Sequence, residues 1–331
     1  MVIIGTLIGA GFASGREIYL FFMKYGKLGQ FGIFISGILT SLIIYLVLNK
    51  VREKGIVSYS DLLREINPKN EKINKYINLI VNSFLLISFY IMIAGFSAYI
   101  EQTYKLPIYL SSIIFVIICY IVFQRNIQGM MRINSYLVPF LIFLIIYLGM
   151  KNIPYLLESR GIIEISIKQR GFLISSLLYT SYNSIILVPV LVTMNNFVKT
   201  KKEINLISIY SGLIVVILSF LIYGLLIKGQ FYIENLEMPL IEITKQFGMI
   251  FKYIYGFVII VSIFTSAIST GYSFLENISK DEKIYKRNLI LMSIIGVFIS
   301  NIGFSNLVQI LYPLFGILGL VQIVLLFLKY T

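Results

Sequence analysis

The stretch Gly5-Thr6-Leu7-Ile8-Gly9-Ala10-Gly11-Phe12-Ala13-Ser14-Gly15 opens the chain with four glycines in eleven residues, and Arg16 and Glu17 follow it directly. Glycine weakens a helix by roughly 1 kcal/mol relative to alanine. Non-helical backbone at membrane depth persists only where it faces protein or a watery cavity. We therefore expect an interrupted membrane span whose non-helical positions are Gly9 and Gly11.

Two alternatives stay open for this stretch. Small residues also let neighbouring membrane helices approach closely without any break. A short apolar start is also a feature of signal peptides, although no basic segment precedes this one. The residues after the glycines favour a break, because Ser14 to Glu17 has the form of a capping box. In that motif the Ser14 side chain accepts a hydrogen bond from the Glu17 amide, and the Glu17 carboxylate reaches back to the Ser14 amide. A new half-helix then starts at this point.

The rest of the chain has the composition of an integral membrane protein. Of its 331 residues, 58% are hydrophobic and only 13% are charged, which is too apolar for a soluble domain of this size. A spanning helix needs roughly 20 predominantly apolar residues. Charge-free runs of about that length are 28–49, 77–100, 106–124, 133–150, 171–198, 204–227 and 253–275, and 288–328 is long enough for two spans. With the interrupted first span, we expect about ten transmembrane helices and an all-α fold.

Charge and residue usage exclude several functions. The net charge of +13 need not mean nucleic-acid binding, because in a membrane protein basic residues gather on the cytoplasmic side. With both termini inside, seventeen of the 28 lysines and arginines fall in cytoplasmic segments and ten in outer ones. Histidine is absent and Cys119 is the only cysteine, which excludes histidine metal sites and cysteine clusters. No catalytic motif is present, so we expect no enzyme, and we expect a multi-pass protein of the cell membrane.

Two connections between the spans carry further expected features. Residues 59–66 have apolar side chains at helical spacing and predict a short amphipathic helix on the cytoplasmic surface, with a solvated linker as the alternative. Pro239 precedes a short apolar stretch, 240–247, which we expect to cover the outer face.

Ten spans divide into two sets of five, with a boundary near 151–169. We expect one transmembrane domain with a first repeat at about 1–150 and a second at about 170–331. Inverted repeats with discontinuous helices form the binding sites of many secondary transporters. Span six, the counterpart of span one, contains Thr180, Tyr182 and Asn183 in mid-membrane. We expect a break there, with a continuous helix making interhelical hydrogen bonds as the alternative.

Span eight carries a stripe of hydroxyl groups. Its members recur at helical spacing on one face, and they are Ser262, Thr265, Ser266, Ser269, Thr270 and Ser273. Hydroxyls together with carbonyls of an unwound neighbour suit a monovalent cation such as sodium. Close packing of small residues against another helix is the alternative.

The residues Gly9-Ala10-Gly11-Phe12-Ala13-Ser14-Gly15-Arg16-Glu17-Ile18, followed by Phe21-Phe22 and Tyr25-Gly26, resemble the opening signature of the YkvI family of bacterial membrane proteins. The resemblance implies membership of the amino acid/polyamine/organocation superfamily and a LeuT-type inverted repeat of five plus five helices, with helices one and six broken. It also implies a sodium site made of the Gly5 and Ile8 carbonyls with Ser262, Thr265 and Ser266.

Taken together, these features predict a secondary active transporter, a cation-coupled symporter of a small solute such as an amino acid. The candidate solute-binding residues are Gly9, Ala10, Gly11, Tyr90, Thr180, Tyr182 and Asn183. Sodium is the candidate coupling ion and no other cofactor is expected. The expected partners are the solute and the lipid bilayer. A non-transporting receptor for nutrients or germinants on the same fold is the alternative.

Overall fold

The computed structural model describes residues 2–56, 58–66, 71–124, 130–158, 171–194, 198, 200–229, 233, 236–279 and 281–328. Every regular element in these ranges is a helix, which confirms the expected all-α class. In chain order the helices are α1 (Val2–Leu7), α2 (Ala10–Ala13), α3 (Arg16–Phe21), the 3-10 helix η1 (Met23–Tyr25), α4 (Lys27–Lys54), α5 (Tyr59–Ile66), α6 (Glu71–Tyr104), α7 (Ile108–Phe123), α8 (Met130–Glu158), α9 (Phe172–Thr193), α10 (Lys201–Lys228), α11 (Pro239–Lys245), α12 (Met249–Ile278), α13 (Glu282–Ser300) and α14 (Phe304–Leu328).

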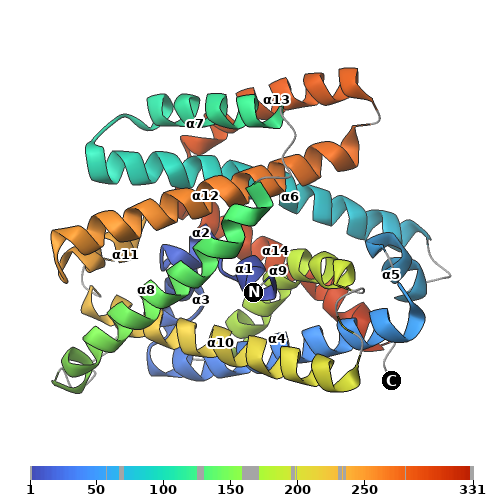
Figure 1. Ribbon diagram of the computed structural model, residues 1–331, viewed down its shortest axis with the longest axis horizontal. Coiled ribbons are helices and arrows are strands. Elements are labelled where there is room, and N and C mark those ends of the chain that lie inside the picture. Colours follow the sequence, from blue (N-terminus) through green and yellow to red (C-terminus); the bar gives the residue numbers. More distant parts are fainter. Residues whose placement is uncertain are drawn as a thin grey trace.

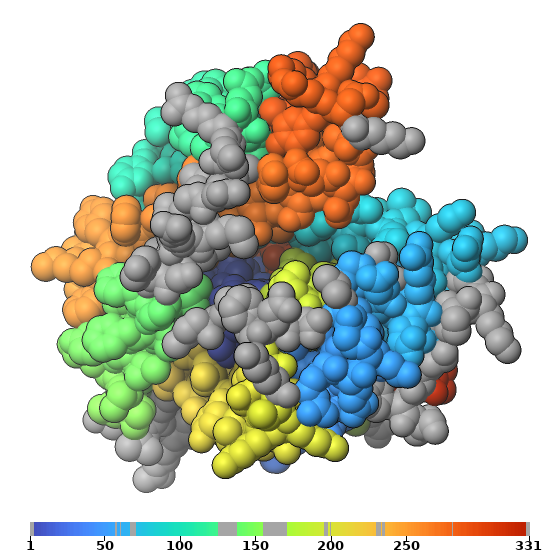
Figure 2. Space-filling view, turned by 45° about the vertical axis from the view of Figure 1, so that its right-hand side comes forward, coloured from blue at the N-terminus to red at the C-terminus, as the bar shows by residue number. Residues whose placement is uncertain are grey.

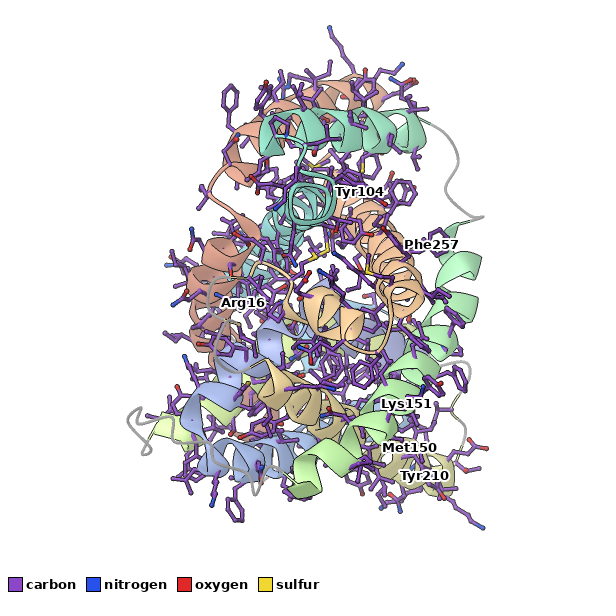
Figure 3. All side chains as sticks on the ribbon, turned by 90° about the vertical axis from the view of Figure 1, so that its left-hand side faces the viewer. Arg16, Tyr104, Met150, Lys151, Tyr210 and Phe257 are labelled. Atoms are coloured by element: carbon purple, nitrogen blue, oxygen red, sulfur yellow. The ribbon has the colours of Figure 1, made fainter. Side chains whose placement is uncertain are left out.

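Six of these helices, α4, α6, α9, α10, α12 and α14, are long and apolar enough to cross a membrane. Large apolar side chains lie on the outside of the molecule, among them Met150, Tyr210 and Phe257, which are 60%, 57% and 65% exposed (Figure 3). Such a surface is stable in lipid and not in water. The chain is therefore an integral membrane protein, whereas the expected count of ten spans stays a prediction.

The long helices surround the N-terminal segment. Helices α7 and α13 pack together at one end of the molecule, α4 and α10 at the opposite end, and α6 crosses α12 between them (Figure 1). The N-terminus lies near the middle of the same view. In the space-filling view the darkest blue atoms, which belong to the N-terminal segment, are visible only deep between the outer helices (Figure 2). The glycine-rich stretch is thus buried inside the helix bundle.

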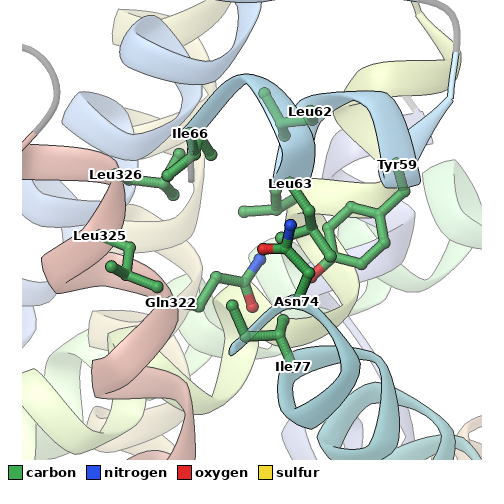
Figure 4. Close-up of a pocket in the computed structure, with 10 residues that line it drawn as sticks. Tyr59, Leu62, Leu63, Ile66, Asn74, Ile77, Gln322, Leu325 and Leu326 are labelled. Atoms are coloured by element: carbon green, nitrogen blue, oxygen red, sulfur yellow. The ribbon is translucent and has the colours of Figure 1, made fainter. Parts of the chain in front are cut away.

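A short helix is present in each of these two connections. Helix α5 covers the ends of α6, α9 and α14, and its Leu62 and Leu63 are 0% and 3% exposed. Figure 4 shows these side chains around a small pocket that also includes Gln322 of α14. The amphipathic prediction for 59–66 is confirmed, and the solvated linker is excluded. Helix α11 starts at Pro239, in the connection that we expected to cover the outer face. Most of the predicted boundary between repeats, 159–170, lies outside the described residues.

The predicted break in span six is wrong for the residues where we placed it. Helix α9 runs without interruption from Phe172 to Thr193. The Thr180 hydroxyl donates to the Ser176 carbonyl at 3.0 Å, and the Asn183 amide donates to the Tyr179 carbonyl at 2.9 Å. These polar groups bond to carbonyls one turn earlier in an intact helix. Polarity in mid-span therefore did not require the helix to open.

Helices α9 and α14 pack at backbone distance. A Cβ built on Gly319 of α14 would overlap the Ser181 carbonyl of α9, and one on Gly316 would lie 2.7 Å from the Leu178 carbonyl oxygen. A backbone carbonyl cannot rotate away as a side chain can, so glycine is required at both positions. Small residues commonly permit such approaches between membrane helices.

We predict that Gly319→Ala destabilises the protein by about 1–3 kcal/mol, the usual cost of overpacking, because α14 must move away from α9. Thermal unfolding of the purified protein in detergent measures this loss. Gly9→Ala is the matched control, since a Cβ at Gly9 meets no atom within 4 Å. An unfolding temperature for Gly319→Ala equal to that of the control contradicts the close contact.

Candidate functional site around the broken first helix

The first span is interrupted twice, as its glycines suggested. Helix α1 ends at Leu7, and Gly9 adopts an extended conformation with φ −82° and ψ −177°. Helix α2 then ends at Ala13, and Gly15, at φ 82°, precedes α3. This left-handed conformation favours glycine because it has no Cβ. The prediction holds at Gly9, but Gly11 lies within α2 and is helical.

Other helices satisfy the backbone carbonyls that the breaks expose. The Tyr255 hydroxyl of α12 donates to the Ala13 carbonyl at 2.7 Å, and the Leu240 amide of α11 donates to the Ser14 carbonyl at 3.0 Å. At the far end of α3, the Ser175 hydroxyl of α9 donates to the Phe21 carbonyl at 2.7 Å. An unsatisfied carbonyl in a membrane costs several kcal/mol. The second break is thus part of a hydrogen-bond network with three other helices.

The predicted capping box at Ser14 is wrong. The Ser14 hydroxyl donates to the Gly11 carbonyl at 2.9 Å and accepts from the Arg16 amide at 3.3 Å. Gly15, which has no side chain to cap the helix, is the residue that precedes α3. The Glu17 carboxylate does not turn back to Ser14. It points instead towards α2 and α9.

Glu17 lies in the centre of the site and is only 2% exposed. The Tyr182 hydroxyl and the Phe12 amide lie within hydrogen-bonding reach of its carboxylate. The side chain also lies against Gly11, where a Cβ would overlap the Glu17 Oε1 atom. Among the described residues, the other oxygen, Oε2, has no hydrogen-bond partner although it is buried.

Aromatic rings enclose this carboxylate. Phe21 stacks on Tyr182 with ring centroids 5.8 Å apart, and Tyr182 stacks on Tyr312 of α14 at 4.6 Å. Tyr179 meets Phe21 edge to face at 5.4 Å. The rings pack against one another and leave hydroxyl groups as the polar elements of the wall. Broken span one, α9 and α14 therefore meet around one acidic group.

Arg16 points to the other side of α3 and connects it to the segment between α10 and α11. Its guanidinium donates to the Ile233 and Leu236 carbonyls, both at 3.4 Å. In the same segment Glu237 accepts from the Ser305 amide at the start of α14, at 2.5 Å. Burial raises the pKa of Glu237, and the Ser305 amide and the Arg16 charge partly oppose this effect. Arg16 and Glu237 thus hold the segment between α10 and α11 against α3 and α14.

The structure brings together only some of the predicted solute-binding residues. Gly9, Ala10 and Gly11 lie at the first break, and Tyr182 reaches the same region through Glu17. Thr180 and Asn183 are buried in α9, where the Thr180 hydroxyl and the Asn183 amide donate to backbone carbonyls of the same helix. The ring of Tyr90 on α6 lies against Gly296 of α13.

The predicted sodium ligands lie on two separate elements. Ser262 and Thr265 of α12 are buried, and Ser266 is partly buried. The Thr265 hydroxyl donates to the Val261 and Ser262 carbonyls, at 3.0 and 3.1 Å. Ile8 is buried, whereas Gly5 lies against Val138 of α8.

The stripe as a whole does not face the protein interior, because Ser269 is exposed.

Sequence reasoning missed the role of Glu17 and the contribution of Tyr179 and Tyr312. An acidic residue inside a membrane span is by itself a sign of a functional site. That signal was present, but the capping-box pattern offered a local structural role for the same residue. The two tyrosines carried no signal, since aromatic residues are common throughout this chain.

Comparison with known proteins finds relatives along nearly the whole chain. The Bacillus subtilis (strain 168) protein described as uncharacterized membrane protein YkvI is 27% identical over 327 residues, which cover 96% of this chain and 91% of the relative. Uncharacterized protein YyaD of the same organism is 26% identical over 329 residues, covering 99% and 95%. These similarities confirm the resemblance to YkvI that the first span suggested. No protein-family model matches the chain.

Among solved structures, the manganese transporter of Eremococcus coleocola in complex with an aromatic bis-isothiourea substituted compound is similar at a TM-score of 0.45 and 16% identity. The alignment covers 98% of this chain and 68% of the other. A mutant form of that transporter gives a TM-score of 0.47 and 15% identity, with the same coverage.

We predict that Tyr255→Phe destabilises the protein by about 1–3 kcal/mol, because it leaves the buried Ala13 carbonyl without its donor. Thermal unfolding in detergent measures the effect. Tyr253→Phe on the same helix is the control, since Tyr253 is 51% exposed. If both variants unfold at the wild-type temperature, the hydroxyl of Tyr255 does not support the break.

Proposed function

We propose that this protein is a secondary transporter that carries a small solute, such as an amino acid, past the broken first helix, coupled to a cation. The observation that carries the proposal is irregular backbone deep inside a membrane protein, stabilised by α9, α11 and α12. Transporters use such discontinuous helices to bind solutes near the middle of the bilayer. The two breaks leave α2 as a buried four-residue segment between α1 and α3.

The contacts between helices support an inverted repeat of five plus five spans, as in the LeuT-type fold. We count α1 to α3 together as span one and leave out the short helices α5 and α11. Each span in the first half then has a counterpart five spans later. Three of these pairs pack against each other directly: α4 with α10, α6 with α12, and α7 with α13. In addition, the contact between α8 and α12 has a counterpart between α14 and α6. A twofold axis in the membrane plane would produce such a pattern.

Counterflow tests transport without assuming a coupling ion. Liposomes containing the purified protein are loaded with an unlabelled mixture of amino acids and diluted into single radiolabelled amino acids. A transporter accumulates label transiently by exchange, and protein-free liposomes do not. Binding of an amino acid, detected by a thermal shift, without any exchange contradicts the proposal and favours a receptor.

We propose that the coupling ion is sodium, bound by the predicted hydroxyls of α12 and by the Gly5 and Ile8 carbonyls. We predict that Thr265→Val raises the sodium concentration needed for a half-maximal thermal shift roughly tenfold, equivalent to about 1.4 kcal/mol. Valine keeps the shape of threonine and removes one ligand oxygen. Ser269→Ala is the control, because Ser269 belongs to the same stripe but is exposed. An unchanged sodium dependence in Thr265→Val excludes this site.

A further inference from the structure

The carboxylate of Glu17 lacks a compensating charge. It is 2% exposed, and its Oε2 atom has no hydrogen-bond partner among the described residues. A buried carboxylate that is ionised and unpaired is unstable, so such groups either bind a cation or take up a proton. The structure must therefore supply a positive charge to Glu17 or keep it neutral.

No described side chain that faces Glu17 supplies that charge. The titratable groups near it are Tyr179 and Tyr182 from α9 and Tyr312 from α14, all of them phenols. Phenols are neutral at physiological pH. Arg16 is adjacent in sequence, but its guanidinium reaches the Ile233 and Leu236 carbonyls and lies 5.2 Å from the centre of the Tyr19 ring.

The walls of the site favour a proton over larger cations. A metal cation needs several oxygen ligands around it, whereas the neighbours of Glu17 include the packed rings of Phe21, Tyr182 and Tyr312. An ammonium group needs space, but Glu17 already fills the position where Gly11 lacks a side chain. A proton needs neither a ligand shell nor a cavity.

The position of Glu17 connects protonation to movement. It is the second residue of α3, directly after the break at Gly15, and its partners belong to α2 and α9. Any displacement of α3 from α9 separates Glu17 from Tyr182 and changes its exposure to water. Protonation removes the charge that opposes burial, so it stabilises the packed arrangement over the displaced one.

We propose that Glu17 is a proton-binding site that is protonated when span one packs against α9 and α14 and releases its proton when they separate. The site stands on the surroundings of Glu17, and only its use in coupling rests on the proposed transport function. The proton is then a coupling ion in addition to, or in place of, sodium on α12.

Infrared difference spectroscopy of the purified protein tests the site with protons as the only ligand. We expect a carboxylic acid C=O band from a buried group that disappears as the pH is raised. The band should be lost in Glu17→Gln and retained in Glu237→Gln, which removes the other partly buried carboxylate near span one. Glu17→Asp keeps a carboxyl group and should shift the band, which provides a second test if Glu17→Gln does not fold.

Three outcomes overturn the inference: a wild-type protein without such a band, a band that persists in a folded Glu17→Gln variant, or a band that sodium chloride removes at constant pH. The last result identifies Glu17 as a sodium site.

Liposome assays then separate the site from its role. With the amino-acid mixture, Glu17→Gln should retain counterflow and lose accumulation driven by a pH gradient. If the wild-type protein shows the titrating band but gives no counterflow in liposomes, the transport function is contradicted and the proton site is not. Accumulation driven by a pH gradient in Glu17→Gln contradicts the coupling role.

Discussion

The need to satisfy backbone hydrogen bonds away from water explains most of the arrangement around the first span. Two breaks in a buried helix expose carbonyls that lipid cannot satisfy. The Ala13, Ser14 and Phe21 carbonyls receive donors from α12, α11 and α9. Because these donors come from distant parts of the chain, the bundle must be assembled before the broken span is stable.

The same constraint accounts for the different behaviour of spans one and six. In α9 the polar side chains return their hydrogen bonds to carbonyls one turn earlier, so the helix remains closed. At the second break the Ser14 hydroxyl also donates to an earlier carbonyl, that of Gly11, but Gly15 has a positive φ angle that directs the chain out of the helix. A polar residue in mid-span thus stabilises its own helix, whereas a break at a glycine leaves carbonyls that need hydrogen-bond donors from neighbouring helices.

The site has two components that differ in the length of their helices. Helices α9 and α14 are joined at backbone distance through Gly316 and Gly319 and provide one aromatic wall. Helices α2 and α3 are short. Ile8 and Gly9 connect α1 to α2, and Ser14 and Gly15 connect α2 to α3. Glu17 lies where these two components meet. Its carboxylate contacts both components, through the Phe12 amide of α2 and the Tyr182 hydroxyl of α9.

From the sequence alone followed the membrane class, the break at Gly9 and the short helix at 59–66, because each depends on local composition or on glycine geometry. The resemblance to YkvI could also be read from one local motif. Tertiary structure decided whether Ser14 or Gly15 occupies the N-cap position of α3, whether α9 opens, and where Glu17 points. These outcomes depend on which distant donor or ring lies within a few ångströms, and a one-dimensional pattern of residue types does not contain that information.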